Sequence, residues 1–133
     1  LKLSIALQMN KPELETDKVH ITLLDNSIFR ILVKEDAKLD IEDLDKNHSF
    51  FLEHKIEPKA LFLIVFKNGA TTEKGATEKF FEKGRMKIKR KEALVIATLP
   101  NRIMANLYVG LSKRSHPTKI FSNEEDAVKW LTE

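Results

Sequence analysis

The chain has 133 residues, of which 42% are hydrophobic and 32% charged, a balance that supports one folded domain and excludes a disordered chain. It contains no cysteine, which excludes a disulfide framework and cysteine-ligated metals. Its net charge of +3, from 23 basic and 20 acidic residues, is too small to favour nucleic acid as a partner. No apolar run approaches the roughly 18 residues that a membrane-spanning helix needs. We therefore expect a cytoplasmic protein with no membrane span.

We expect a single domain over residues 1–133, with residues 1–18 forming an N-terminal tail or an extra strand. The first segment, Leu1–Asn10, has only a short apolar piece at Leu3–Leu7. It lacks the longer apolar core and the small-residue cleavage site of a secretory signal. No repeat, low-complexity segment or long linker divides the chain that follows.

Five segments have strand patterns. Val19–Leu24 alternates apolar and polar residues, and Ile28–Lys34 follows after a turn, so the two predict a hairpin. Leu61–Phe66 is apolar at all six positions, which is typical of a strand buried on both faces of a parallel sheet. The other two predicted strands are Ala93–Leu99 and Thr118–Phe121.

Helical spacing follows each of the later strands. Asp40 is the expected N-cap of a helix that runs to about Lys55. Thr72 or a neighbour caps the next helix, which ends near Gly84 in a left-handed C-cap. A third helix begins at Pro100, and Ser122 with Glu125 has the spacing of a capping box for the last helix.

The order of these elements predicts the fold class. After the N-terminal hairpin, helices and strands alternate, which indicates an α/β fold with a mixed, mostly parallel sheet and about four helices. Ligand sites in such sheets lie beyond the carboxyl ends of the strands. The loop after Leu61–Phe66 is therefore the first candidate region for a site.

The C-terminal third carries a resemblance to a known family. It includes the helix Arg102-Ile103-Met104-Ala105-Asn106-Leu107-Tyr108, then Pro117-Thr118-Lys119-Ile120-Phe121, then an acidic helix that ends in Trp130-Leu131. These segments resemble the small stand-alone bacterial STAS-like (SpoIIAA-like) family, relatives of anti-sigma-factor antagonists. The resemblance implies a STAS-like sheet with helices, and a domain that binds proteins or nucleotides or acts as a phosphorylation switch.

The resemblance also implies a place for a phosphorylated hydroxyl, at the start of the helix after the central strand. The family's Asp-Ser-Ser-Gly pattern is absent there, and the available hydroxyls are Thr71, Thr72 and Thr77. A phosphate on any of them would lie near the positive end of the helix dipole. The alternative is that one of them only caps the helix.

Other polar groups show no pattern of catalysis or metal binding. The histidines His20, His48, His54 and His116 include no pair four residues apart, so no helical metal site is expected. We expect His48 to be partly buried on a helix face and His116 to be exposed in a loop. We expect the basic run Arg85–Lys91 to be a solvated helix end and connector. We therefore expect no catalytic residue, no metal and no cofactor.

The remaining indication of a functional surface comes from apolar residues. Two vicinal pairs, Phe50-Phe51 and Phe80-Phe81, indicate aromatic surface that points away from the core on each helix. Such surface becomes an interface or a small apolar pocket. The candidate interface residues are Phe80, Phe81, Met104, Leu107 and Tyr108.

Together these features predict a non-enzymatic regulatory or protein-interaction module. Its partner is a protein, with self-association into a homodimer through helix faces as the preferred form. The alternative is a carrier of a small apolar ligand or lipid, since related folds of this shape enclose such molecules.

Overall fold

The computed structural model describes residues 11–133, apart from nine side chains in its helices, those of Lys74, Phe80, Lys83, Leu99, Pro100, Asn101, Ile103, Met104 and Leu107. The strands are β1 (Glu13–Glu15), β2 (Val19–Leu23), β3 (Ile28–Val33), β4 (Lys38–Leu39), β5 (Ala60–Phe66), β6 (Thr71–Thr72), β7 (Lys89–Ile96) and β8 (Thr118–Phe121). The helices are α2 (Ile41–His54), α3 (Lys74–Phe80), α4 (Lys83–Met86), α5 (Leu99–Ser112) and α6 (Glu124–Leu131). Over the described residues this is a mixed α/β structure with five helices.

The central sheet is mostly parallel. Its six strands have the order β1-β2-β3-β5-β7-β8. The β2–β3 hairpin and the β1–β2 pair are antiparallel, whereas β3, β5, β7 and β8 pair in parallel. The hairpin, the central strand and the mostly parallel sheet expected from the sequence are thus confirmed.

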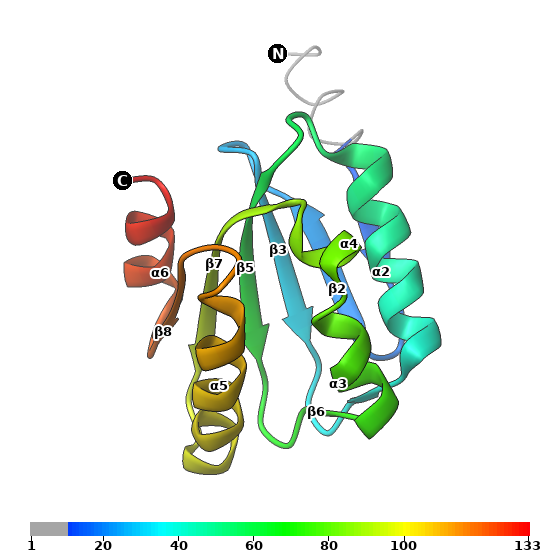
Figure 1. Cartoon of the computed structure of the whole chain (residues 1–133), viewed down its shortest axis with the longest axis vertical. Coiled ribbons are helices and arrows are strands. Elements are labelled where there is room, and N and C mark those ends of the chain that lie inside the picture. The colour runs from blue at the N-terminus through cyan, green and yellow to red at the C-terminus, as the bar shows by residue number, and fades with distance from the viewer. Residues whose placement is uncertain (1–10) are drawn as a thin grey trace.

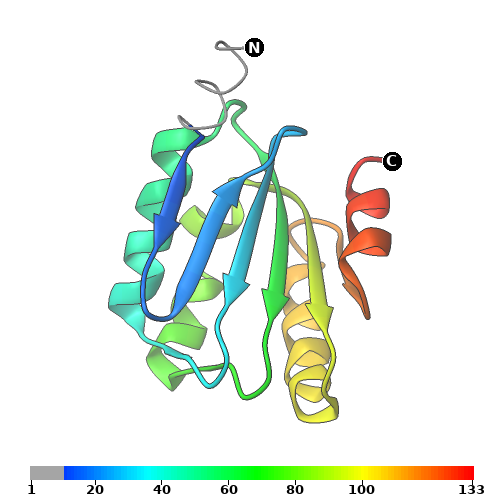
Figure 2. The same ribbon diagram turned by 180° about the vertical axis from the view of Figure 1, so that it is seen from behind.

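The two faces of the sheet carry different layers. Helices α2, α3, α4 and α5 lie on one face, and α6 lies alone on the other (Figure 1, Figure 2). The larger core packs between the sheet and the first group of helices, and a smaller core packs under α6 around Ala127 and Leu131. Because β5 lies between these cores, every residue from Ala60 to Val65 is buried, which explains its unbroken apolar sequence.

The aromatic pair on α2 belongs to the core. Phe50 is buried and Phe51 half-buried. Their ring centroids lie 6.1 and 5.0 Å from that of Phe29 on β3. Phe51 also meets Phe62 edge-on at 4.9 Å. The expectation that this pair leaves aromatic surface outside the core is wrong, because neighbouring rings of β3 and β5 cover it.

Helix boundaries match the sequence at α2 and differ at α6 and around Gly84. Asp40 caps α2, with its side chain accepting a hydrogen bond from the Asp43 amide at 2.8 Å. The cap of α6 is Asn123 and not Ser122, because the Asn123 side chain accepts from the Asp126 amide at 2.9 Å. Gly84 is no left-handed C-cap: it lies inside α4, a short helix that begins after a break at Phe81.

None of the described helices has the length and apolar character needed to cross a membrane.

Candidate functional site: an apolar cavity between α3 and α5

A cavity of about 620 Å³ lies on the helical face of the sheet, between α3 and α5. Its floor is formed by alternate residues of the two central strands, Ile64 and Phe66 of β5 and Leu94 and Ile96 of β7. The register places these side chains in adjacent rows, since Ile64 pairs with Leu94 and Phe66 with Ile96. The other described residues that line it are Ala70, Thr72, Thr77, Phe81, Ala105, Asn106, Tyr108, Gly110, Leu111 and Arg114.

One wall of the cavity is α5. Asn106, Gly110 and Arg114 line it at intervals of four residues, so they form one stripe along the helix and the turn that follows. Gly110 leaves that stripe open, because a Cβ added there would meet nothing within 4 Å. Ala105, Tyr108 and Leu111 complete this wall.

The opposite wall comes from α3 and the turn before it. Gly69 has φ +77°, a left-handed conformation that glycine adopts without strain, and it reverses the chain after β5. A backbone hydrogen bond of 2.9 Å from the Asp36 amide to the Asn68 carbonyl joins this turn to the loop after β3. The short strand β6 then pairs in parallel with β4, which places Thr72 at the cavity.

The candidate threonines have different positions. Thr72 and Thr77 both line the cavity, and their hydroxyl oxygens lie 2.7 Å apart. Thr77 also donates to the Glu73 carbonyl at 3.1 Å. Thr71 pairs with Lys38 in the β4–β6 ladder and is absent from the cavity lining described here. The N-cap position of α3 is Glu73, with no side-chain cap among the described residues, so the three hydroxyls do not cap this helix.

Two of the candidate interface residues also line the cavity. Phe81 and Tyr108 line the cavity and contact each other across it, with ring centroids 5.2 Å apart. This contact joins the end of α3 to α5. The side chains of Phe80, Met104 and Leu107 lie outside the described residues.

Behind Tyr108 lies a buried polar network. Glu92 of β7 is fully buried and receives hydrogen bonds from the Tyr108 hydroxyl at 2.6 and 2.7 Å. The Lys89 ammonium lies 2.9 Å from the Glu92 carboxylate and 3.0 Å from the Tyr108 hydroxyl. His116 Nε2 lies 2.9 Å from Glu92 Oε1. The network therefore ties α5 and the loop before β8 to the central sheet.

The electrostatics of this network favour the ionised carboxylate. Burial raises the pKa of Glu92, but the charge of Lys89 and the hydrogen bonds from His116, Tyr108 and Lys89 outweigh it and lower the pKa to about 2. Burial and the Glu92 charge raise the pKa of Tyr108 well above its usual range. Tyr108 is thus a hydrogen-bond donor to Glu92 and a poor proton source for catalysis.

Two sequence expectations are wrong here. His116 is 4% exposed and not a free loop histidine, because Glu92 draws its ring into the protein. Lys89 is 8% exposed and belongs to β7, so the run Arg85–Lys91 is not a uniformly solvated connector. The sequence patterns did not identify Glu92 as a site residue. Its one signal in the sequence is that it is an acidic residue within an otherwise basic and apolar strand. His48 is half-buried, as expected, and burial lowers its pKa.

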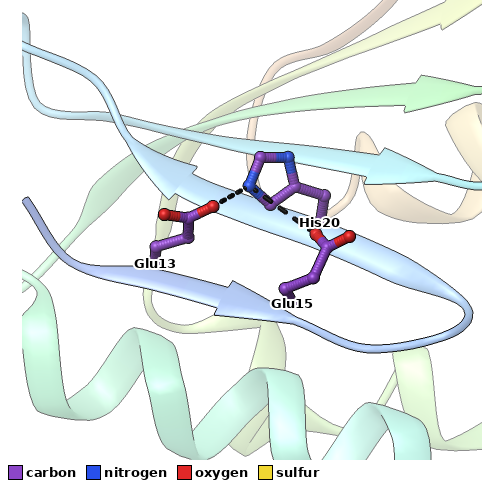
Figure 3. Close-up of side chains that lie close together, drawn as sticks. All are labelled: Glu13, Glu15 and His20. Atoms are coloured by element: carbon purple, nitrogen blue, oxygen red, sulfur yellow. Dashed lines mark hydrogen bonds and ion pairs between the residues drawn. The ribbon is translucent and has the colours of Figure 1, made fainter.

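In the part of the chain that the structure describes, one group of side chains has the composition of a metal site. Glu13 and Glu15 of β1 and His20 of β2 project toward one another from the edge of the sheet (Figure 3). Their ligand atoms lie within 4.8 Å of one another. His20 Nε2 already contacts Glu13 and lies 3.7 Å from Glu15, and the Lys34 ammonium lies 2.6 Å from Glu15. Cross-strand ion pairs account for this group without a metal.

Comparison with known proteins gives a family and no function. Residues 22–133 match the family described as Domain of unknown function (DUF7793). No curated protein and no solved structure matches the chain. The matched range includes β5, α3, β7 and α5, and therefore every residue of the cavity, but it excludes Glu13, Glu15 and His20. Because the match covers well over half of the sequence, the chain belongs to the DUF7793 family.

Proposed function

We propose that the chain is a non-enzymatic binding module whose cavity between α3 and α5 holds a small apolar molecule. The observation that carries the proposal is the cavity itself. Its volume of about 620 Å³ lies within the range of small-molecule sites, roughly 300–1,000 Å³. Its floor and much of its walls are apolar, with a few polar groups, the usual composition of such a site.

The surroundings of the cavity support binding over catalysis. Behind the wall of the cavity, the titratable groups of the Glu92 network form hydrogen bonds with one another. The Tyr108 hydroxyl is directed to Glu92 and so does not offer a general acid to a bound molecule. The STAS-like fold inferred from the C-terminal segments remains part of this proposal, since related folds enclose apolar ligands.

A matched pair of glycine variants tests the proposal. Gly110 and Gly84 are both exposed helical glycines at which an added Cβ meets nothing within 4 Å, but only Gly110 lines the cavity. We expect Gly110→Phe to fill the cavity and to abolish binding of 1,8-ANS, a fluorescent sulfonate whose aromatic rings bind apolar surface. Gly84→Phe should bind the probe like the wild type.

Native mass spectrometry of the freshly purified protein complements this test. A co-purifying small mass that is present in the wild type and in Gly84→Phe, and lost in Gly110→Phe, supports a ligand in the cavity. Equal probe binding by all three proteins would refute it.

A second candidate function is that of a regulatory module that binds a protein through the same groove. The observation that favours it is Leu111, which lines the groove and is 49% exposed. A groove between two helices also accepts an apolar face of a partner's helix. In that case a pull-down from the native host yields a protein that Gly110→Phe no longer retains, while the purified protein carries no small mass.

A further inference from the structure

We infer that the molecule held in the cavity is an amphiphile with a carboxylate head group, which binds at Arg114. This inference rests on the proposed function, since it names the chemical class of the ligand. Among the described residues that line the cavity, Arg114 is the only charged one, and no aspartate or glutamate accompanies it. The cavity therefore combines an apolar interior with a single positive charge.

The position of Arg114 leaves its charge available. It is exposed, in the turn that follows α5, and no carboxylate lies within ion-pair distance of it in the described part of the chain. Two other arginines differ: Arg30 lies 2.7 Å from Glu124, and Arg85 is paired with Asp45. A guanidinium at the rim of an apolar cavity attracts an anionic group on whatever occupies that cavity.

The single charge favours a carboxylate over a phosphate monoester. The planar guanidinium donates two parallel hydrogen bonds to the two oxygens of a carboxylate. One arginine balances the single charge of a carboxylate, whereas a phosphate monoester carries about −1.5 to −2 at pH 7. Neutral polar groups, the Asn106 amide and the Thr72 and Thr77 hydroxyls, lie along the same cavity and can meet a further polar atom of the ligand.

The rest of the ligand is expected to be apolar. Ile64, Phe66, Leu94 and Ile96 offer hydrocarbon contacts and no hydrogen bonds from their side chains. Within the length that the cavity accepts, each added methylene should tighten binding roughly fourfold. A straight-chain fatty acid of medium length has both features, and it serves as a defined probe.

Isothermal titration with three ten-carbon probes tests the inference, each below its critical micelle concentration at pH 7. The probes are decanoate, decanol and decylamine, which have ten carbons each and carry a negative, a neutral and a positive head group. We expect decanoate to bind about tenfold more tightly than decanol, the effect of one charged hydrogen-bonded pair at a partly exposed site. Decylamine, whose positive charge meets Arg114, should bind most weakly.

Variants on α5 and its following turn assign the effect to one side chain. Arg114→Gln should reduce the preference for decanoate over decanol to about onefold, and Arg114→Lys should retain part of it. Arg102→Gln is the matched control, because Arg102 is an exposed arginine of α5, the helix before the Arg114 turn, and is not among the described residues that line the cavity. It should keep the full preference.

The outcomes separate this inference from the proposed function. If decanoate and decanol bind wild type equally, or if Arg114→Gln keeps the preference, the carboxylate inference is wrong and an apolar ligand site remains. If none of the probes binds and Gly110→Phe also leaves 1,8-ANS binding unchanged, the proposed function itself fails. A tighter complex with decyl phosphate than with decanoate would assign Arg114 to a phosphate head group and so overturn the inference.

Discussion

At the scale of single residues, Glu92 is the side chain on which the structure around the cavity depends most. It is fully buried, and it bonds to Lys89, Tyr108 and His116. Removing one partner of a buried ion pair costs more than the pair contributes, because the other charge stays buried without compensation. We therefore predict that Glu92→Gln lowers the free energy of unfolding by about 3–5 kcal/mol in urea titrations. Glu125→Gln, at an exposed position of α6, should change it by less than about 0.5 kcal/mol.

The lowered pKa of Glu92 also predicts how stability depends on pH. The pKa is about 2 in the folded protein, below its ordinary value of 4.5, so the folded state favours the ionised form. The resulting stabilisation is fully present above pH 4.5 and is lost as the pH falls toward 2. Urea titrations at several pH values should show the difference between wild type and Glu92→Gln shrinking over that window. A difference that stays constant from pH 6 to pH 2.5 would contradict the role of ionised Glu92.

At the scale of elements, the turn that connects β5 to β6 positions one wall of the cavity. Gly69 has φ +77°, and a Cβ there would overlap the Asp36 carboxylate. We predict that Gly69→Ala destabilises the protein by about 1–2 kcal/mol, the cost of a left-handed conformation for an L-residue. Gly84→Ala, which adds a Cβ in open space within α4, should be neutral or stabilise by up to about 1 kcal/mol. Thermal unfolding of the two variants checks both values, and equal effects would rule out the backbone argument.

Elements with strong local signals could be predicted from the sequence, and elements created by distant contacts could not. The Asp40 cap, the apolar run of β5 and the last strand, Thr118–Phe121, depend on neighbouring residues, and the structure has them as expected. The strand β7 begins four residues before the predicted Ala93, because Lys89 is neutralised by Glu92 within the protein. His116 is buried by the same carboxylate, 24 residues away along the chain.

The candidate site was predictable only in part, because it too depends on contacts between segments that are distant in the sequence. The region after β5 was identified from the topology of parallel sheets, and Thr72, Thr77, Phe81 and Tyr108 do line one cavity. That these residues share it depends on the packing of α3 and α5 over the same two strands, which no local pattern encodes. Arg114, in a turn after α5, carried no sequence signal of a site.

At the scale of the whole molecule, the arrangement of layers explains where a site can form. Four helices share one face of the sheet, whereas α6 alone lies on the other (Figure 1). The cavity lies between α3 and α5, over β5 and β7. The strands beneath it are the most buried in the protein, and their pairing fixes the floor.

Self-association through helix faces remains a prediction at this scale. Substitutions of two exposed leucines test which helix forms the interface. Leu111 on α5 and Leu52 on α2 are 49% and 50% exposed, so they present equal apolar surface on different helices. If the dimer forms through α5, Leu111→Lys should shift the protein toward the monomer mass of 15.3 kDa in light scattering at high micromolar concentration. Leu52→Lys should leave the dimer unchanged. A monomer mass for the wild type at that concentration would refute self-association, and dissociation by Leu52→Lys alone would move the interface to α2.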